Sequence, residues 1–175
     1  MNYGSIKKTD IANGIGVRVS LFVSGCTHHC KECFNPQTWD FGYGDPYTEE
    51  TQREVMDALA PDFITGLSLL GGEPMEPDNQ RALLPLIRAF KSAYPQKDLW
   101  IYSGYTFDTD LAEGGKAHCE ATDEILSMTD ILVDGEFMID LKNISLRFRG
   151  SENQRIIRAK ESKKAGVIIL ADEFM

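Results

Sequence analysis

Three of the four cysteines in this 175-residue chain lie in one short segment, with the spacing Cys-x3-Cys-x2-Cys at Cys26, Cys30 and Cys33. Thiolates are soft ligands that favour iron–sulfur clusters, zinc and Cu(I). A four-iron cluster normally takes four cysteines, so three local ones leave one iron without a protein ligand. The spacing therefore predicts a metal centre with an open coordination position, suited to chemistry rather than to scaffolding.

Other arrangements of these thiols remain open at this point. Residues at i, i+4 and i+7 share one face of a helix, so the cysteines could be buried on a helical stripe. The polar run 27–32, preceded by Gly25, favours a loop instead. A structural zinc site would take His28 or His29 as its fourth ligand. Cys119 could be a further ligand or a redox thiol, but a lone cysteine is more often a small buried side chain.

The length and composition predict one globular domain in a reducing compartment. The chain is 42% hydrophobic and 26% charged, which is ordinary for a globular protein. No secretory signal and no apolar run of about 18 residues is found. Bunched cysteines do not resemble a secreted disulfide framework. We therefore expect a cytoplasmic protein with no membrane partner.

The net charge of −9 argues against general nucleic-acid binding. The charge is uneven, because residues 142–164 carry eight basic and two acidic side chains, a net of +6. That segment is either a solvated face or a docking surface for an acidic partner.

Hydrophobic patterning predicts alternating strands and helices. Residues 2–13 are polar and end in a turn. We expect strands at 17–23, 64–70, 99–103 and 131–133, with a possible last strand at 166–170. We expect helices from an N-cap at Thr48 to about Leu59, across 78–94 and across 122–128. Pro85 should kink or break the second of these helices. This order is typical of an α/β fold with a mostly parallel sheet.

Four loops should meet at one edge of such a sheet, where parallel strands end. They are 26–35, 71–75, 103–106 and 134–137. The pair Gly71-Gly72 would let a ligand approach the backbone closely. Glu73 and Asp134 add carboxylates, and Glu73 could neutralise an ammonium group.

Several segments, in order along the chain, carry a resemblance to a known family. They are Asp-Ile-Ala-Asn-Gly-Ile-Gly at 10–16, Leu-Phe-Val-Ser-Gly-Cys at 21–26, Cys-Phe-Asn at 33–35, Gly-Gly-Glu-Pro-Met at 71–75, Trp-Ile-Tyr-Ser-Gly-Tyr at 100–105, Asp-Ile-Leu-Val-Asp-Gly-Glu-Phe at 130–137 and Arg-Gly-Ser-Glu-Asn-Gln at 149–154. The cysteine motif with Gly-Gly-Glu-Pro resembles the radical S-adenosylmethionine (SAM) superfamily. The full set is similar to the activating proteins of anaerobic ribonucleoside-triphosphate reductase.

The resemblance implies a partial, open (β/α) barrel of the radical SAM type, since the chain is short for a full barrel. It covers residues 1–158 as a single radical SAM domain. The tail 159–175 matches nothing in the family pattern, and its role stays open. The ferredoxin-like cysteine insert of some other glycyl-radical activases is absent from the sequence.

The resemblance also implies an oxidoreductase. Cys26, Cys30 and Cys33 would hold a [4Fe–4S] cluster whose unligated iron binds SAM. Reductive cleavage of SAM would give a 5′-deoxyadenosyl radical, which takes hydrogen from a glycine of the large reductase subunit and leaves a glycyl radical. A reduced flavodoxin or a similar donor would supply the electron.

By the same resemblance, Gly71, Gly72 and Glu73 meet the amino end of SAM. The backbone of residues Glu32, Cys33 and Phe34 would flank the adenine, and Ser103 and Asp134 are further expected contacts. Three more aromatic side chains could shape the SAM pocket or simply pack: Trp39, Tyr102 and Tyr105. Two rival functions remain, a radical SAM enzyme for a small molecule and a non-catalytic binding module stapled by zinc.

Overall fold

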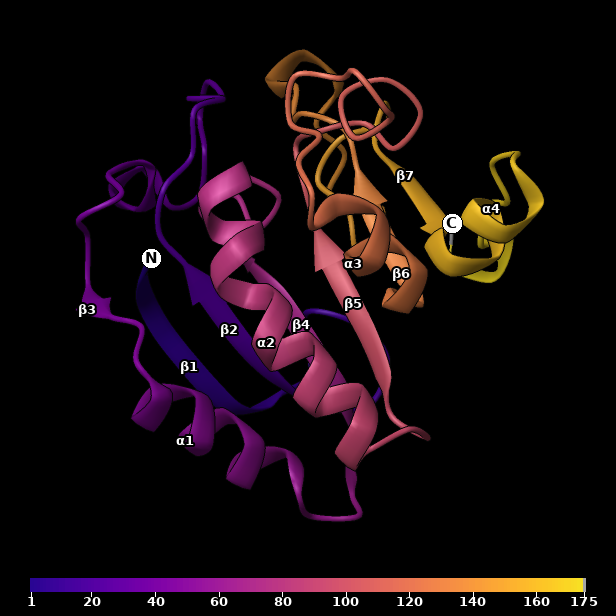
Figure 1. Ribbon diagram of the computed structural model, residues 1–175. Coiled ribbons are helices and arrows are strands. Elements are labelled where there is room, and N and C mark those ends of the chain that lie inside the picture. Colours follow the sequence, from indigo (N-terminus) through magenta and orange to yellow (C-terminus); the bar gives the residue numbers. More distant parts are fainter. Residues whose placement is uncertain (175) are drawn as a thin grey trace.

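One mixed sheet of seven strands organises the computed structural model, which describes residues 1–174 (Figure 1). The strand order is β3-β1-β2-β4-β5-β6-β7. The parallel centre consists of β2 (Val17–Val23), β4 (Ile64–Gly71), β5 (Asp98–Tyr102) and β6 (Ile131–Asp134). The antiparallel outer strands are β1 (Asn2–Asp10), β3 (Asp45–Pro46) and β7 (Arg155–Arg158). The predicted α/β class is confirmed, and the sheet is not closed.

Three helices lie on one face of the sheet (Figure 1). They are α1 (Glu49–Leu59), α2 (Pro77–Ala93) and α3 (Thr122–Met128), and α4 (Ala159–Ala165) packs beside α3. Short 3-10 turns occur at Pro36–Trp39, Ile139–Leu141 and Asp172–Phe174. The predicted cap at Thr48 is confirmed, because its side chain accepts a hydrogen bond from the Thr51 backbone N–H. Within residues 1–174, no helix is both long and apolar enough to cross a membrane.

The central strands alternate between an apolar face and a more polar one. Side chains such as Leu21, Leu69 and Ile101 point into the main core beneath the helices. Ser20 and Ser68, one residue before Leu21 and Leu69, are fully buried polar side chains. Because side chains of a strand alternate between its two faces, the helix-free face carries these serines beside a smaller apolar cluster that includes Trp100 and Val133, and Val133 also lines the candidate site.

Arg18 is the largest polar side chain on that second face, and it is fully buried. Its Nε donates to Ser68 Oγ at 2.8 Å, and its terminal nitrogens donate to the Ile15 and Leu67 carbonyls at 3.1 and 3.0 Å. Nη1 also lies 2.5 Å from Asp98 Oδ1. The guanidinium therefore ties the start of β2 to β4 and β5 through several donors.

Four features of the fold differ from what the sequence patterns predict. The polar segment 2–13 contains the nine-residue strand β1, which was missed because most of its side chains are exposed or only half-buried at one side of the sheet. Residues 166–170 form no strand and make only an isolated bridge between Ile157 and Leu170. α2 continues through Pro85, so the predicted break does not occur. Its side chains Leu83, Leu86, Ile87 and Phe90 are buried in the core, and their burial offsets the roughly 3 kcal/mol that an interior proline costs. The sheet is also mixed rather than mostly parallel, since β1, β3 and β7 all pair antiparallel.

The C-terminal segment after β7 folds back along that strand. The Arg158 N–H donates to the Ile169 carbonyl, and the Ala171 N–H donates to the Ile156 carbonyl, each at 2.9 Å. The ring of Phe174 then packs 5.4 Å from that of Trp100. Residues 169–171 therefore cover the outer edge of β7.

Candidate iron–sulfur site

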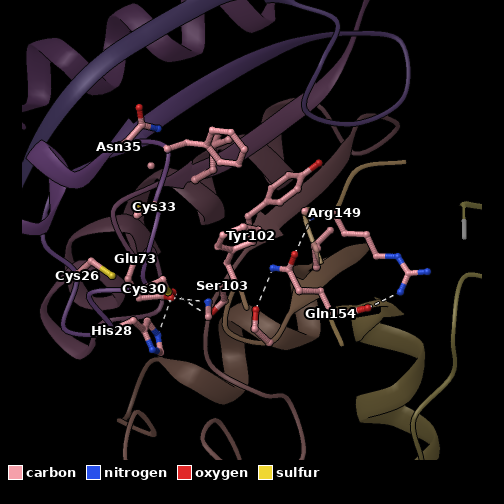
Figure 2. Close-up of a pocket in the computed structure, with 18 of the residues that line it drawn as sticks. Cys26, His28, Cys30, Cys33, Asn35, Glu73, Tyr102, Ser103, Arg149 and Gln154 are labelled. Atoms are coloured by element: carbon pink, nitrogen blue, oxygen red, sulfur yellow. Dashed lines mark hydrogen bonds and ion pairs between the residues drawn. The ribbon is translucent and has the colours of Figure 1, made fainter. Parts of the chain in front are cut away.

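The cysteine loop lines one end of a cavity of about 540 Å³. Its volume lies within the range of small-molecule sites. All four loops that we expected to meet contribute to its lining, through residues within 26–35, 71–73, 103–104 and 135–137. Figure 2 shows the cysteines, His28 and Glu73 at one end and Tyr102, Arg149 and Gln154 at the other.

Backbone hydrogen bonds fix the start of the cysteine loop between two neighbours. The Gly72 N–H donates to the Val23 carbonyl at 2.7 Å, and the Glu73 N–H donates to the Gly25 carbonyl at 2.8 Å. On the other side, the Gly25 N–H donates to the Thr38 carbonyl at 2.8 Å. A Cβ on Gly72 would lie 2.6 Å from the Gly25 carbonyl oxygen. Gly72 is therefore required by the close approach of backbones, in addition to any contact with a ligand.

The three thiols of the motif share the cavity and form no disulfide. Burial raises the pKa of Cys26 to about 12 and that of Cys30 to about 11. Both thiols are therefore protonated at neutral pH until a metal displaces the proton. Within residues 1–174, no group of three or more Cys, His, Asp or Glu side chains stands in metal-binding geometry. The donor chemistry nevertheless fits an iron–sulfur cluster, because three thiols on one loop line one cavity.

The two histidines of the loop are engaged in other contacts. His28 Nε2 lies 3.2 Å from Glu73 Oε2, and its ring packs against Tyr105 with centroids 4.3 Å apart. Burial lowers the pKa of His28, but the Glu73 carboxylate raises it by more, so it lies above its ordinary value. His29 stacks on Trp39 at 4.7 Å. These contacts favour a loop role over a zinc-ligand role for both imidazoles.

Glu73 is almost fully buried, and its carboxylate holds three loops together. Oε1 accepts from the Met75 N–H and from Ser103 Oγ, both at 2.8 Å. Oε2 accepts from the Gly104 N–H at 2.7 Å. The predicted acidic group therefore lies at the cavity wall, where it positions Ser103 and the backbone on either side.

We expect Glu73→Gln to lower the thermal midpoint by roughly 5 °C, equivalent to about 2 kcal/mol. The glutamine amide has nearly the same shape as the carboxylate. Its NH2 group is a donor, however, and it would face the Gly104 N–H or the donors of Met75 and Ser103, which need an acceptor. The measurement is thermal unfolding by circular dichroism under anaerobic conditions. Glu113→Gln is the matched control, since Glu113 is exposed. Equal midpoints for the two variants would contradict this role for Glu73.

The remaining predicted contact residues fall in different places. Phe34 and Ser103 line the cavity, and Phe34 is 75% exposed. Glu32 is exposed, with a positive φ of 61°, and does not line the cavity within residues 1–174. Asp134 is fully buried beneath the lining, where Arg155 donates to it through Nε at 2.9 Å and Nη2 at 2.5 Å.

Sequence reasoning missed a second buried carboxylate, Glu76. Its Oε1 accepts from the Thr27 N–H at 2.8 Å, from Thr27 Oγ1 at 2.6 Å and from Tyr105 Oη at 3.1 Å. Glu76 thereby fixes the residue that follows Cys26. The sequence gives only a weak signal for it, a second glutamate three residues after Glu73.

The far end of the cavity was also missed, because no periodic pattern marks it. Several side chains of the segment between β6 and β7 line it: Phe137, Lys142, Asn143, Ile144, Leu146, Phe148, Arg149 and Gln154. Tyr102 and Trp39 line the cavity as well, whereas Tyr105 is buried behind it. The cavity therefore extends well beyond the cysteine loop.

Comparison with known proteins supports an iron–sulfur cluster in this chain. A family described as a 4Fe-4S single cluster domain matches residues 12–157. The anaerobic ribonucleoside-triphosphate reductase-activating protein of Pasteurella multocida is 42% identical over 90% of this chain and 98% of its own. The proteins of the same name from Escherichia coli K12 and Enterobacteria phage T4 are 38% and 37% identical, over 88% and 89% of this chain and 96% and 93% of their own. This chain therefore belongs to the family of anaerobic ribonucleoside-triphosphate reductase-activating proteins.

Proposed function

We propose that this protein activates the anaerobic ribonucleotide reductase by reductive cleavage of SAM, as a radical SAM oxidoreductase. The observation that carries this function is the single cavity shared by Cys26, Cys30, Cys33 and the Gly71–Glu73 loop. A [4Fe–4S] cluster bound there would supply the electron that cleaves SAM, and the resulting 5′-deoxyadenosyl radical would take hydrogen from a glycine of the large reductase subunit.

The chain's own residues would hold and orient these groups. Cys26, Cys30 and Cys33 would be the cluster ligands. The Gly71–Glu73 loop would meet the amino end of SAM, held in place by the hydrogen bonds of Glu73 to Ser103 and Gly104. The backbone of residues Glu32, Cys33 and Phe34 would flank the adenine. Asp134 would act through its contact with the Phe107 N–H, at 2.8 Å, beneath the lining.

The same proposal extends to the type of fold, the domain bounds, the location in the cell and the electron donor. The unclosed sheet would be the partial, open barrel of the radical SAM type, within one domain spanning residues 1–158. The tail 159–175 would add cover at the edge of that domain, with Met175 outside the described residues. The protein would work in the cytoplasm with reduced flavodoxin or a similar electron donor, without nucleic acid or membrane.

The decisive test combines the anaerobically reconstituted protein with SAM, a reductant and the large reductase subunit. We expect about four irons per chain, cleavage of SAM to methionine and 5′-deoxyadenosine, and a glycyl radical signal by electron paramagnetic resonance. A colourless protein with one zinc would instead indicate a binding module. SAM cleavage without a glycyl radical would indicate a radical SAM enzyme for a small molecule.

A further inference from the structure

The segment 136–150, here called the rim loop, leaves the sheet after β6 and is held at its base by hydrogen bonds. Gln154 Oε1 accepts from the Gly150 N–H at 2.8 Å, and its Nε2 donates to the Gly135 carbonyl at 3.0 Å. The Glu152 N–H donates to the Leu141 carbonyl at 2.9 Å. The loop is therefore ordered in place rather than supported by a core of its own.

Apolar side chains on this ordered loop face solvent. Ile144 is 92% exposed and Met138 is 47% exposed. Across the cavity mouth, Phe34 of the cysteine loop lies 6.0 Å from the Phe137 ring, centroid to centroid. Exposed apolar side chains beside a cavity and ringed by polar groups mark interaction sites. The mouth of the cavity is therefore an apolar surface without a partner among residues 1–174.

Two basic side chains of the segment 142–164, Lys142 and Arg149, line the cavity. Four of its eight basic side chains are neutralised by ion pairs within the chain: Arg155, Arg158, Lys160 and Lys163. Lys142 Nζ instead lies 5.6 Å from the centre of the Phe34 ring, and no ion pair is found for it within residues 1–174. The rim loop also carries Asp140, which does not line the cavity among residues 1–174, and Glu136, whose carboxylate lies close enough to Cys30 and His28 to raise the pKa of each. The charges of the loop are therefore divided, with Glu136 near the cysteines and Lys142 and Arg149 in the lining farther along the cavity.

We propose that the rim loop docks the glycine-bearing segment of the reductase large subunit, an extended stretch with an apolar side chain for Ile144 and a carboxylate for Lys142. This inference rests on the proposed function. An occupant of this kind fits because the apolar rim is continuous with the cavity where the cysteine loop lies. The carboxylate on that segment is inferred from Lys142, because a carboxylate is the group that would pair with an ammonium for which no ion pair is found within residues 1–174.

The test is direct binding of the purified large reductase subunit to the cluster-loaded protein, measured anaerobically by calorimetry. Ile144→Asp should weaken binding about tenfold or more, because it puts a charge in an apolar contact. Lys142→Glu should also weaken binding and should flatten its dependence on salt. Val167→Asp and Lys164→Glu are matched controls, since both residues are exposed on the C-terminal segment, and they should bind as the wild type does.

Glycyl radical formation by the wild type separates the two proposals. If the wild type generates the radical but all four variants bind alike, the docking inference is overturned and the proposed function stands. If the wild type binds without generating a radical, and Ile144→Asp still loses binding, the docking inference holds and the proposed function falls. Iron content near the wild-type value verifies that each variant is folded and loaded.

Discussion

Replacing Cys26, Cys30 or Cys33 singly with alanine should reduce the iron content from about four per chain to below about one. Under the proposed function, reductive cleavage of SAM should fall on the order of a thousandfold or more, because the three proposed ligands would act as one unit. The physical reason is that all three thiols line one cavity, on a loop whose backbone is fixed on both sides. Iron analysis, the visible spectrum and quantified 5′-deoxyadenosine measure the effect.

Cys119→Ala is the matched control for this series. Cys119 Sγ donates to Gln80 Oε1 at 3.4 Å and, within residues 1–174, does not line the cavity. The variant should keep its iron and its activity. A Cys119 variant that lost the cluster, or a Cys30 variant that kept it, would contradict the assignment of the ligands.

Arg18→Ala should lower the free energy of unfolding by about 3–5 kcal/mol, a drop in thermal midpoint of roughly 10 °C. The change removes donors from two backbone carbonyls and Ser68, and it leaves a cavity inside the sheet. Arg18→Lys should recover only part of this loss, because an ammonium cannot reproduce the geometry of the planar guanidinium. Thermal unfolding of the anaerobically prepared proteins provides the comparison.

Arg53→Ala is the corresponding control, since Arg53 is exposed on α1. Its effect should stay within about 0.5 kcal/mol. A midpoint for Arg18→Ala within about 2 °C of the wild type would show that the buried guanidinium contributes little net stability, as happens where desolvation cancels the gain.

The central part of the fold is predictable from the sequence because its signals are local. The strands β2, β4, β5 and β6 are short apolar runs, and α1 begins at a recognisable cap. The outer strands lack such signals. β1 is a mostly polar strand, β3 has only two residues, and β7 lies inside a basic segment. Their positions depend on pairing with strands that are distant in the sequence.

The candidate site, like the fold, has one part that the sequence predicts and another that it does not. The spacing of the cysteines and the Gly71-Gly72 pair mark the loops that meet at the cavity. The sequence could not reveal that the Glu73 carboxylate is already bound by three donors, or that Asp134 is paired with Arg155. These contacts join residues separated by up to about thirty positions. Side-chain partners at such separations follow from the folded geometry, not from local patterns.

The covered edge of β7 restricts how another polypeptide can bind beside the rim loop. Residues 169–171 already use the outer hydrogen-bonding groups of that strand, through the Arg158 N–H and the Ile156 carbonyl. Strand addition, by which an extended peptide joins a sheet, is therefore blocked at this edge. At the opposite edge, β3 pairs only with Asn2 and Tyr3, so the rest of β1 is not covered in this way. A segment bound at the rim loop, which connects β6 to β7, must be recognised by side chains and loops, so its specificity will depend on which side chains it carries and less on its backbone.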